Sequence, residues 1–371
     1  MDEIRHIEDL QELVKKGLCD IKQFGDVDVK EFGDLLFFHY NFDCEMENRW
    51  NYFETISRGL ILNKYTGDVV ARPFDKFHNW MAHGRYTKSP AKTIFEKLDG
   101  SCGILYRDNG DYKICTKKSV DNSQSITGTT MLNLYLASKD DIIKDEWTLI
   151  FEIIYPLNRI VVPYGDEMTG LHLLAIRNRF TGEYVNEMID VVADYYGFGK
   201  PKIYEFSTFV EMIDAVEQMP FSKEGFVVEF KDGERFKFKS PEYLKIHRLV
   251  TNISEKNIAE IYASGSLHEY KKNVPDEFLD EIMGFEEEIT MKLNTTLTNC
   301  ITCYLNAPKY SRKEYALYIQ KNYKDLSKYM FKFLDGKGID VFLDIFFKSE
   351  YGINMNRDQK IEHLKSKMEG K

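Results

Sequence analysis

The stretch Phe95–Gly103 reads FEKLDGSCG, and it places Lys97 at the end of a predicted strand, before a turn and a second strand. A lysine in this position can point into a cleft. An amine is a nucleophile only when it is neutral, and burial or a neighbouring cation lowers the pKa of a lysine. Attack by Lys97 on the α-phosphate of ATP would leave a lysyl-phosphoramidate. The tetrapeptide Lys97–Gly100, which reads KLDG, also matches a pattern of ordinary exposed turns. The stretch alone therefore leaves both interpretations open, a nucleophile or a surface turn.

A second stretch, Arg235–Lys239, reads RFKFK and alternates strictly between basic and apolar residues. The two-residue period of a strand puts Lys237 and Lys239 on one face and the two phenylalanines on the other. Two ammonium groups on one face repel each other unless an anion lies between them, and a triphosphate is a suitable anion. The alternative is a half-exposed strand with a solvated basic face.

Two carboxylates lie in or beside apolar runs. Glu152 interrupts the run Ile150–Ile154, and Glu224 precedes the run Phe226–Phe230. Charged groups in such runs are rarely buried unless they are paired or bind a ligand, and Mg²⁺ prefers oxygen ligands while retaining water. Both glutamates are therefore candidates for Mg²⁺ (or Mn²⁺). The alternatives are a buried ion pair for Glu152 and an edge-strand position for Glu224.

The whole chain has 371 residues, which predicts two domains. Its formal net charge of −10 argues mildly against a nucleic-acid binder, although an acidic chain can carry a local basic groove. Six scattered cysteines indicate reduced thiols, and the Cys300–Cys303 pair lacks the further ligands of a zinc site. No apolar signal segment or membrane-spanning run is present, so we expect a cytoplasmic protein.

The pattern of the chain changes near residue 250. Short apolar runs and the hairpin signals Asp108–Gly110 and Lys231–Gly233 predict a strand-rich α+β domain over 1–250, with helices near 126–138, 184–196 and 207–217. Residues 251–371 predict an all-α domain, with helices near 255–264, 276–304, 311–333, 338–348 and 357–369.

These stretches, in this order, resemble the superfamily of ATP-dependent ligases and mRNA capping enzymes. The resemblance is closer to the phage RNA ligase 1 family and covers residues 35–250. The closer resemblance is carried by His39–Phe42, Ser57–Gly59, Arg72–Asn79, Pro156–Val161, Leu173–Arg177 and Thr181–Tyr184. The stretches that resemble motifs of the whole superfamily are Lys97–Gly100, Phe151–Glu152, Glu224–Gly225 and Lys237–Lys239. The resemblance implies an adenylation (nucleotidyltransferase) domain of antiparallel sheets and helices, with a helical C-terminal domain for RNA or tRNA recognition.

The resemblance also implies a role for single residues. Lys97 would be the adenylated nucleophile. The ATP-binding positions would be Tyr40, Arg58 and Lys76 at the triphosphate tail, Lys117 (or its neighbour Lys118), Glu152, Ile176 in the adenine pocket, and Lys237 and Lys239 at the α-phosphate. The candidate metal-binding carboxylates are Asp99, Glu152 and Glu224. Cys115 departs from the family, which has a basic residue there, and puts one RNA or phosphate contact in doubt.

The implied activity is ATP-dependent RNA ligation. Lys97 would take AMP from ATP, pass it to an RNA 5′-phosphate, and a 3′-hydroxyl would then displace AMP. The family suggests nicked tRNA as the substrate in RNA repair, functional pairing with a polynucleotide kinase-phosphatase, a phage origin with action in the host cytoplasm, and a monomer. The competing readings are a DNA ligase or capping nucleotidyltransferase, which typically carry a β-barrel after the last lysine motif, and a non-catalytic RNA-binding protein.

Overall fold

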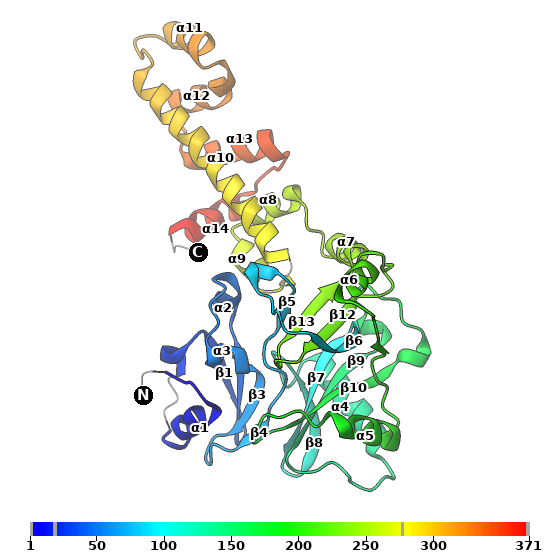
Figure 1. The fold of residues 1–371 in the computed structure, drawn as a ribbon. Helices are drawn as coiled ribbons and strands as arrows, with labels where there is room; N and C mark the ends of the chain where they lie inside the picture. The colour runs from blue at the N-terminus through cyan, green and yellow to red at the C-terminus, as the bar shows by residue number, and fades with distance from the viewer. Residues whose placement is uncertain (1–2, 18–20, 276–277, 369–371) are drawn as a thin grey trace. The chain divides into compact units, whose positions relative to one another are not determined.

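The computed structural model describes residues 3–17, 21–275 and 278–368. The chain divides into two units, Met1–Val250 and Thr251–Lys371. The first unit contains three sheets with helices packed against them, and the described residues of the second are helical without strands (Figure 1). The predicted fold class, an α+β domain of largely antiparallel sheets followed by an all-α domain, is confirmed.

The first sheet has the order β1-β2-β3-β4 and is antiparallel. Its strands are β1 (Val27–Phe32), β2 (Leu35–Tyr40), β3 (Arg58–Asn63) and β4 (Val69–Ala71). Helix α1 (Ile7–Lys15) buries Leu10 and Val14 against it in one apolar cluster. The short helices α2 (Phe42–Met46) and α3 (Tyr52–Ile56) connect β2 to β3.

The second sheet has the order β10-β9-β7-β8. Its strands are β7 (Ser101–Asp108), β8 (Asp111–Thr116), β9 (Trp147–Ile154) and β10 (Gly170–Asn178). Helices α4 (Ser123–Leu136) and α5 (Ile189–Tyr196) contribute Leu132 and Val192 to the core on one face of this sheet. Asn109 and Gly110 both have positive φ, at 51° and 91°, so the predicted hairpin between β7 and β8 is confirmed.

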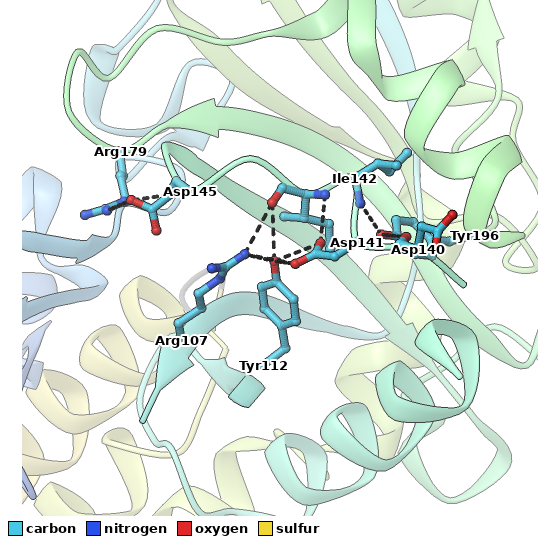
Figure 2. A network of polar contacts seen from close by, with 9 residues as sticks. Arg107, Tyr112, Asp140, Asp141, Ile142, Asp145, Arg179 and Tyr196 are labelled. Carbon is cyan, nitrogen blue, oxygen red and sulfur yellow. Dashed lines mark hydrogen bonds and ion pairs between the residues drawn. The ribbon is translucent and has the colours of Figure 1, made fainter. Parts of the chain in front are cut away.

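Polar contacts hold the end of this sheet where β7 and β8 meet (Figure 2). The guanidinium of Arg107 donates to the Tyr112 hydroxyl and to Asp141 Oδ2, the latter at 3.2 Å. Arg179 Nη2 donates to Asp145 Oδ2 at 2.5 Å. Arg107 and Tyr112 tie the loop before β9 to strands β7 and β8, and Arg179 ties the same loop to the end of β10. These contacts help to fix the strand that carries Glu152.

The third sheet has the order β11-β6-β12-β13-β5. Its strands are β5 (His78–Asn79), β6 (Ala91–Lys97), β11 (Ile203–Tyr204), β12 (Gly225–Phe230) and β13 (Arg235–Lys239). Only the β13–β5 pair is parallel among its described pairings. Helix α6 (Phe209–Glu217) packs against this sheet, and α7 (Pro241–Val250) follows β13. Short 3-10 helices complete the unit: η1 (Ile21–Phe24), η2 (Ala82–Gly84), η3 (Pro156–Asn158), η4 (Asp166–Met168) and η5 (Asn186–Met188).

The second unit is built around one long helix. Its helices are α8 (Glu255–Ala263), α9 (Leu267–Lys271), α10 (Leu279–Asn306), α11 (Arg312–Asn322), α12 (Ser327–Leu334), α13 (Ile339–Tyr351) and α14 (Arg357–Met368), with η7 (Lys324–Leu326) between α11 and α12. Residues 276, 277 and 369, at the ends of two predicted helices, lie outside the described residues. No helix in the described ranges is long and apolar enough to cross a membrane.

The predicted continuous helix over 311–333 is wrong. Tyr323 adopts φ −146° and ψ 48°, which ends α11 and starts the 3-10 turn before α12. Helical periodicity continues across this break, because α11 buries Tyr315 and Ile319 and α12 buries Tyr329 and Met330, at positions that one uninterrupted helix would also bury. The sequence pattern alone therefore does not reveal the break. Cys300 and Cys303 are free thiols buried in α10, as expected of core residues.

Candidate active site

The end of β6 brings Lys97 to the centre of the third sheet. Gly225 on β12 lies between Lys97 on β6 and Lys239 on β13 in the strand register. The carboxylate of Glu224, the residue before Gly225, accepts from Lys97 Nζ at 2.7 Å and from Lys239 Nζ at 3.1 Å. Burial disfavours the charge of Glu224, but the two lysines together hold the pKa of this carboxyl below its ordinary value. One buried carboxylate therefore bridges the predicted nucleophile and a predicted phosphate-binding lysine.

Glycine is required at position 225. Its φ is +141°, and a Cβ there would overlap the carbonyl oxygen of Phe238 on the neighbouring strand. The absence of a side chain lets β12 and β13 approach closely at the point where Lys97, Glu224 and Lys239 meet. The Glu224–Gly225 pair thus supplies a carboxylate and the close strand approach together.

Glu152 reaches the same turn from the second sheet. Its Oε1 atom accepts a hydrogen bond from the backbone N–H of Gly100 at 3.0 Å. Burial raises the pKa of Glu152 to about 7; the ammonium of Lys97 opposes this shift, and the carboxylates of Glu224 and Asp99 add to it. A nearby cation would favour ionisation of this buried carboxyl group, because the cation stabilises the ionised form. Glu152 and Glu224 therefore fit a divalent cation that arrives with a triphosphate.

Asp99 is buried, and its carboxylate contacts protein groups on both oxygens. Oδ2 accepts from the backbone N–H groups of Val161 and Val162 at 2.9 and 2.8 Å, and Oδ1 accepts from the Tyr243 hydroxyl at 2.9 Å. The Asp99 N–H donates to the Tyr164 hydroxyl at 2.8 Å. These bonds tie the turn after Lys97 to the loop before β10 and to α7. The arrangement favours a positioning role for Asp99 over the metal-binding role expected from the sequence.

Lys76 and Tyr40, both expected at the triphosphate tail, lie together. The Lys76 ammonium is 3.4 Å from the Tyr40 hydroxyl, and it lies 4.8 Å and 4.7 Å from the ring centroids of Tyr40 and Trp50. It also pairs with Glu45 Oε1 at 3.0 Å, and the side chains of Lys76 and Glu45 are only 4% and 7% exposed. Sequence reasoning missed Glu45 and Trp50, because their contacts depend on how the segment that connects β2 to β3 packs beside Lys76.

Three further basic residues lie near Cys102 or Phe77, namely Arg58, Lys117 and Lys237. Arg58 Nη1 lies 3.9 Å from Cys102 Sγ, and Cys102 is opposite Glu152 in the register of β7 and β9. The Arg58 guanidinium and the Lys237 ammonium each lie 5.6 Å from the centroid of the Phe77 ring.

Two neighbouring lysines follow β8, and Lys117 is the one that lies nearer to Cys102. Its charge acts on the Cys102 thiol and its backbone packs against Gly59, whereas Lys118 is exposed. The geometry therefore favours Lys117 over Lys118.

The structure contradicts the assignment of Ile176 to the adenine pocket. Ile176 is fully buried and pairs with Leu149 in the core behind the sheet, on the face opposite Glu152. A β-bulge between Leu173 and Ala175 reverses the alternation of side chains, which a two-residue period cannot anticipate. Leu174 packs instead with Phe77 and Cys102 on the side of Glu152.

Cys115, the departure from the family pattern, is fully buried, and its thiol donates to the Ile104 carbonyl at 3.6 Å. A side chain in this environment does not reach a substrate. The described residues contain no preformed group of three or more His, Cys, Asp or Glu side chains arranged for a metal ion.

Comparison with known proteins finds relatives that are described as RNA ligases. A bifunctional polynucleotide kinase/RNA ligase of Autographa californica nuclear polyhedrosis virus is 29% identical over 269 residues, which cover 64% of this chain and 38% of the viral protein. The chain thus spans well under half the length of that relative. An RNA ligase of Rhodothermus phage RM378 is 26% identical over 88% of this chain and 89% of its own length. An archaeal ATP-dependent RNA ligase of known structure aligns with a TM-score of 0.45 and 11% identity, over 90% of this chain and 99% of that chain. The model of one family, described as RNA ligase, matches residues 56–243, just over half of the chain and every strand from β3 to β13, and the protein therefore belongs to the phage-type RNA ligase family.

Proposed function

We propose that this protein is an ATP-dependent RNA ligase that works through an AMP group carried on Lys97. The observation that carries the proposal is the Glu224 carboxylate, which bridges Lys97 and Lys239 while Glu152 binds the turn that follows Lys97. Membership of the RNA ligase family supports the same reading.

In the first step, the neutral Lys97 amine attacks the α-phosphorus of ATP. A P–N bond forms, the bond from the α-phosphorus to the bridging oxygen of pyrophosphate breaks, and the lysine proton leaves. Lys237 and Lys239 are suited to neutralise the α-phosphate, and Arg58, Tyr40 and Lys76 to hold the tail. A divalent cation, Mg²⁺ or Mn²⁺, held by Glu152 and Glu224 would offset the charge of the triphosphate as pyrophosphate departs.

Glu224 has a second effect on the nucleophile. In the absence of ATP its charge compensates Lys97 and Lys239, which would otherwise repel each other across Gly225. A divalent cation bound by Glu224 would compete with Lys97 for this carboxylate, and the attack requires a Lys97 amine that is not held in an ion pair.

In the later steps, AMP passes to the 5′-phosphate of an RNA, and an RNA 3′-hydroxyl displaces AMP to seal the strand. Nicked tRNA is the substrate that we propose for repair. The viral relative is described as both a polynucleotide kinase and an RNA ligase, which supports functional pairing with an end-healing kinase-phosphatase. We place the activity in the cytoplasm, of the host if the source is viral, and propose a monomer.

The test is incubation with α-³²P-labelled ATP, Mg²⁺ and a 5′-phosphorylated single-stranded RNA. We expect label on the protein and circular RNA from wild type, and neither from Lys97→Ala. Lys245→Ala, which removes a lysine whose side chain is 68% exposed on α7, serves as the matched control and should behave as wild type. Label that survives Lys97→Ala would contradict the proposal.

The same assay separates the competing functions. A capping nucleotidyltransferase would take label from GTP, a DNA ligase would seal nicked DNA in preference to RNA, and a non-catalytic RNA-binding protein would take no label. The helical second unit favours RNA ligation over the first two, because those enzymes typically carry a β-barrel after the last lysine motif.

A further inference from the structure

A cavity of about 190 Å³ lies within the first unit, beside the end of the second sheet where β7 and β8 meet. Its wall includes Arg107 on β7, which is five residues along the strand from Cys102, and Cys102 is opposite Glu152 in the register. A strand rises about 3.3 Å per residue, so the cavity is about 16 Å along the sheet from the position of Glu152. The cavity is therefore separate from the residues proposed to bind ATP.

The size of the cavity suits one flat ring system. A cavity of about 150 Å³ inside a protein can hold benzene, whereas a site for a drug-sized ligand takes up about 300 Å³ or more. A water molecule occupies about 30 Å³, so several ordered waters would be needed to fill the space. We therefore expect a single heterocyclic ring to enter, while any sugar or charged group attached to that ring stays at the mouth.

Two polar groups in the wall lack a protein partner. Tyr106 and Trp147 line the cavity and are only 4% and 6% exposed. Within the described residues, neither the Tyr106 hydroxyl nor the Trp147 indole N–H makes a hydrogen bond, yet neither atom is fully enclosed by protein. Because the rest of each side chain is covered, the cavity is the space that these two groups face. Buried tyrosine and tryptophan side chains usually place their polar group against a partner, so the wall offers two hydrogen-bonding groups to a ligand.

Two cations lie beside these groups. Arg107 donates from Nη2 to Tyr112 and Asp141, as Figure 2 shows, whereas its Nε and Nη1 atoms donate to no group in the described part of the chain. The ammonium of Lys144, an exposed residue, lies 5.0 Å from the centroid of the Trp147 ring. A guanidinium with a free edge binds phosphate well. An anionic group attached to a ring in the cavity would therefore have Arg107 and Lys144 within reach.

The wall also contains a hydrogen-bond acceptor. Arg179 donates from Nε to the Asp145 carbonyl at 2.8 Å and from Nη2 to Asp145 Oδ2 at 2.5 Å, and Figure 2 shows the two side chains together. The other carboxylate oxygen, Asp145 Oδ1, accepts no hydrogen bond from the residues that the structure describes. Carboxylates accept from the exocyclic amines of bases, as with N4 of cytosine. The cavity thus offers an acceptor as well as donors.

These features together match the chemistry of a nucleotide. The rings of Tyr106, Tyr112 and Trp147 provide surfaces for a flat base. A base has ring acceptors for the Trp147 indole N–H and can carry an amine for Asp145, and its phosphate suits Arg107. An aromatic side chain of the phenylalanine or tyrosine type has no acceptor in its ring, and a lipid headgroup has no flat ring, so neither uses the whole set.

We propose that the cavity is a second nucleotide-binding site, which takes a base at Tyr106 and Trp147 and its phosphate at Arg107 and Lys144. The nucleotide is either free or part of an RNA strand, because both present the same groups. The inference goes beyond the proposed ligase function, since no residue of this site takes part in the transfer of AMP from ATP to Lys97.

The test uses the full chain and two photoreactive probes, 5-iodocytidine 5′-monophosphate and a 5′-phosphorylated single-stranded RNA with 5-iodocytidine at internal positions. Irradiation links an iodinated base to an adjacent aromatic side chain. Proteolysis and mass spectrometry then identify the labelled peptide, which distinguishes the cavity from the site at Lys97. The probe concentration that gives half-maximal labelling of the peptide containing Trp147 measures the affinity.

We expect wild type to be labelled on the peptide containing Trp147. Tyr106→Phe removes only the hydroxyl and Lys144→Gln only the charge, and each should raise the half-maximal probe concentration about fivefold, the effect of one ordinary hydrogen bond. Tyr65→Phe and Lys88→Gln make the same changes at exposed positions outside the cavity and should behave as wild type. Differential scanning calorimetry checks that all four variants are folded.

Labelling by the monophosphate assigns the cavity to free nucleotides, and labelling by the RNA alone assigns it to a nucleotide of the strand; both results support the inference. Absence of label at Trp147 and Tyr106 from both probes would show a cavity that holds only solvent and would overturn it. So would equal affinity in wild type, Tyr106→Phe and Lys144→Gln. Failure of the proposed ligase function is read separately, since wild type would then form no Lys97–AMP, whatever the probes label.

Discussion

At the scale of single residues, the site is organised by three carboxylates with different partners. Glu224 bridges two lysines, Glu152 binds the turn after Lys97, and Asp99 holds that turn to the surrounding loops. A sequence motif shows all three as acidic residues, whereas their contacts separate cation-binding candidates from a positioning residue. The different contacts lead to two measurable differences, one in the Mg²⁺ requirement of AMP transfer and one in the pH dependence of stability.

Asp99→Asn should lower the free energy of unfolding by about 2 kcal/mol, because two backbone N–H groups and the Tyr243 hydroxyl lose an ionised acceptor. The Mg²⁺ concentration that gives half-maximal Lys97–AMP formation should stay unchanged in this variant and rise in Glu152→Gln. Urea unfolding and a Mg²⁺ titration measure the two quantities. A shifted Mg²⁺ requirement in a fully stable Asp99→Asn protein would restore the metal-binding role for Asp99.

The stability of the protein without nucleotide and cation should carry a pH dependence from Glu152. Because its folded pKa of about 7 lies above the ordinary value of 4.5, the folded protein retains a proton that the unfolded chain releases between these values. The contribution of Glu152 to the free energy of unfolding therefore falls as pH rises from 4.5 to about 7. Glu224 acts outside this window, because its pKa is lowered.

Urea midpoints of wild type and Glu152→Gln, compared at about pH 5 and about pH 7.5, test this dependence. The glutamine variant does not titrate, so the difference between the midpoints should move in favour of the variant at the higher pH. A difference that is independent of pH would show that Glu152 ionises normally in the folded protein.

At the scale of elements, the local pattern predicted the parts whose geometry is local. The strand before Lys97, the Asn109–Gly110 hairpin and the opposite faces of Phe238 and Lys239 follow from turn chemistry and the two-residue period, and the structure has them. The side chain of Ile176 does not face the expected pocket, because a bulge in β10 reverses the alternation of side chains between the two faces of the sheet.

Contacts between distant segments were not predictable at this scale. Glu45 and Trp50 meet Lys76 only when the segment that connects β2 to β3 packs beside it, and no spacing in one sequence encodes that approach. The break at Tyr323 was missed for a different reason, since the apolar period runs on through it. Local patterns thus define elements, and the tertiary fold completes the site.

Gly225→Ala should disrupt the strand pair that holds Glu224 between the two lysines. The added Cβ would overlap the Phe238 carbonyl, and φ of +141° disfavours any side chain. We expect a lower thermal midpoint and loss of most Lys97–AMP formation, read by differential scanning calorimetry and by the label assay. Gly233→Ala, in the exposed β12–β13 turn at φ +90° with no atom within 4 Å of the added Cβ, is the control for backbone strain alone. Equal behaviour of both variants would mean that the close strand approach at Gly225 is not needed.

At the scale of the whole molecule, the residues proposed for AMP transfer all belong to the first unit. Each of its three sheets has an apolar core of its own, as in the clusters around Phe151, Phe38 and Phe226. The second unit holds α8–α14. The chemistry that we propose for Lys97 therefore lies within the first unit.

A fragment of residues 1–250 should fold and form Lys97–AMP, but seal RNA less efficiently than the full chain at low RNA concentration. The reason is that the proposed ATP-binding residues all belong to the first unit, whereas the fragment lacks the helical unit for which the resemblance implies RNA recognition. Label assays and the KM for RNA measure the two effects. A folded fragment that takes no label would show that the second unit contributes to AMP transfer itself.

The central claim is that Lys97 carries AMP, and mass spectrometry after incubation with ATP and Mg²⁺ tests it most directly. The intact protein should gain the mass of one AMP, and proteolytic mapping under conditions that preserve P–N bonds should place that mass on the peptide containing Lys97. Pyrophosphate should reverse the gain. An AMP mass on another residue, or no gain in a folded protein shown to be free of bound AMP beforehand, would contradict the account.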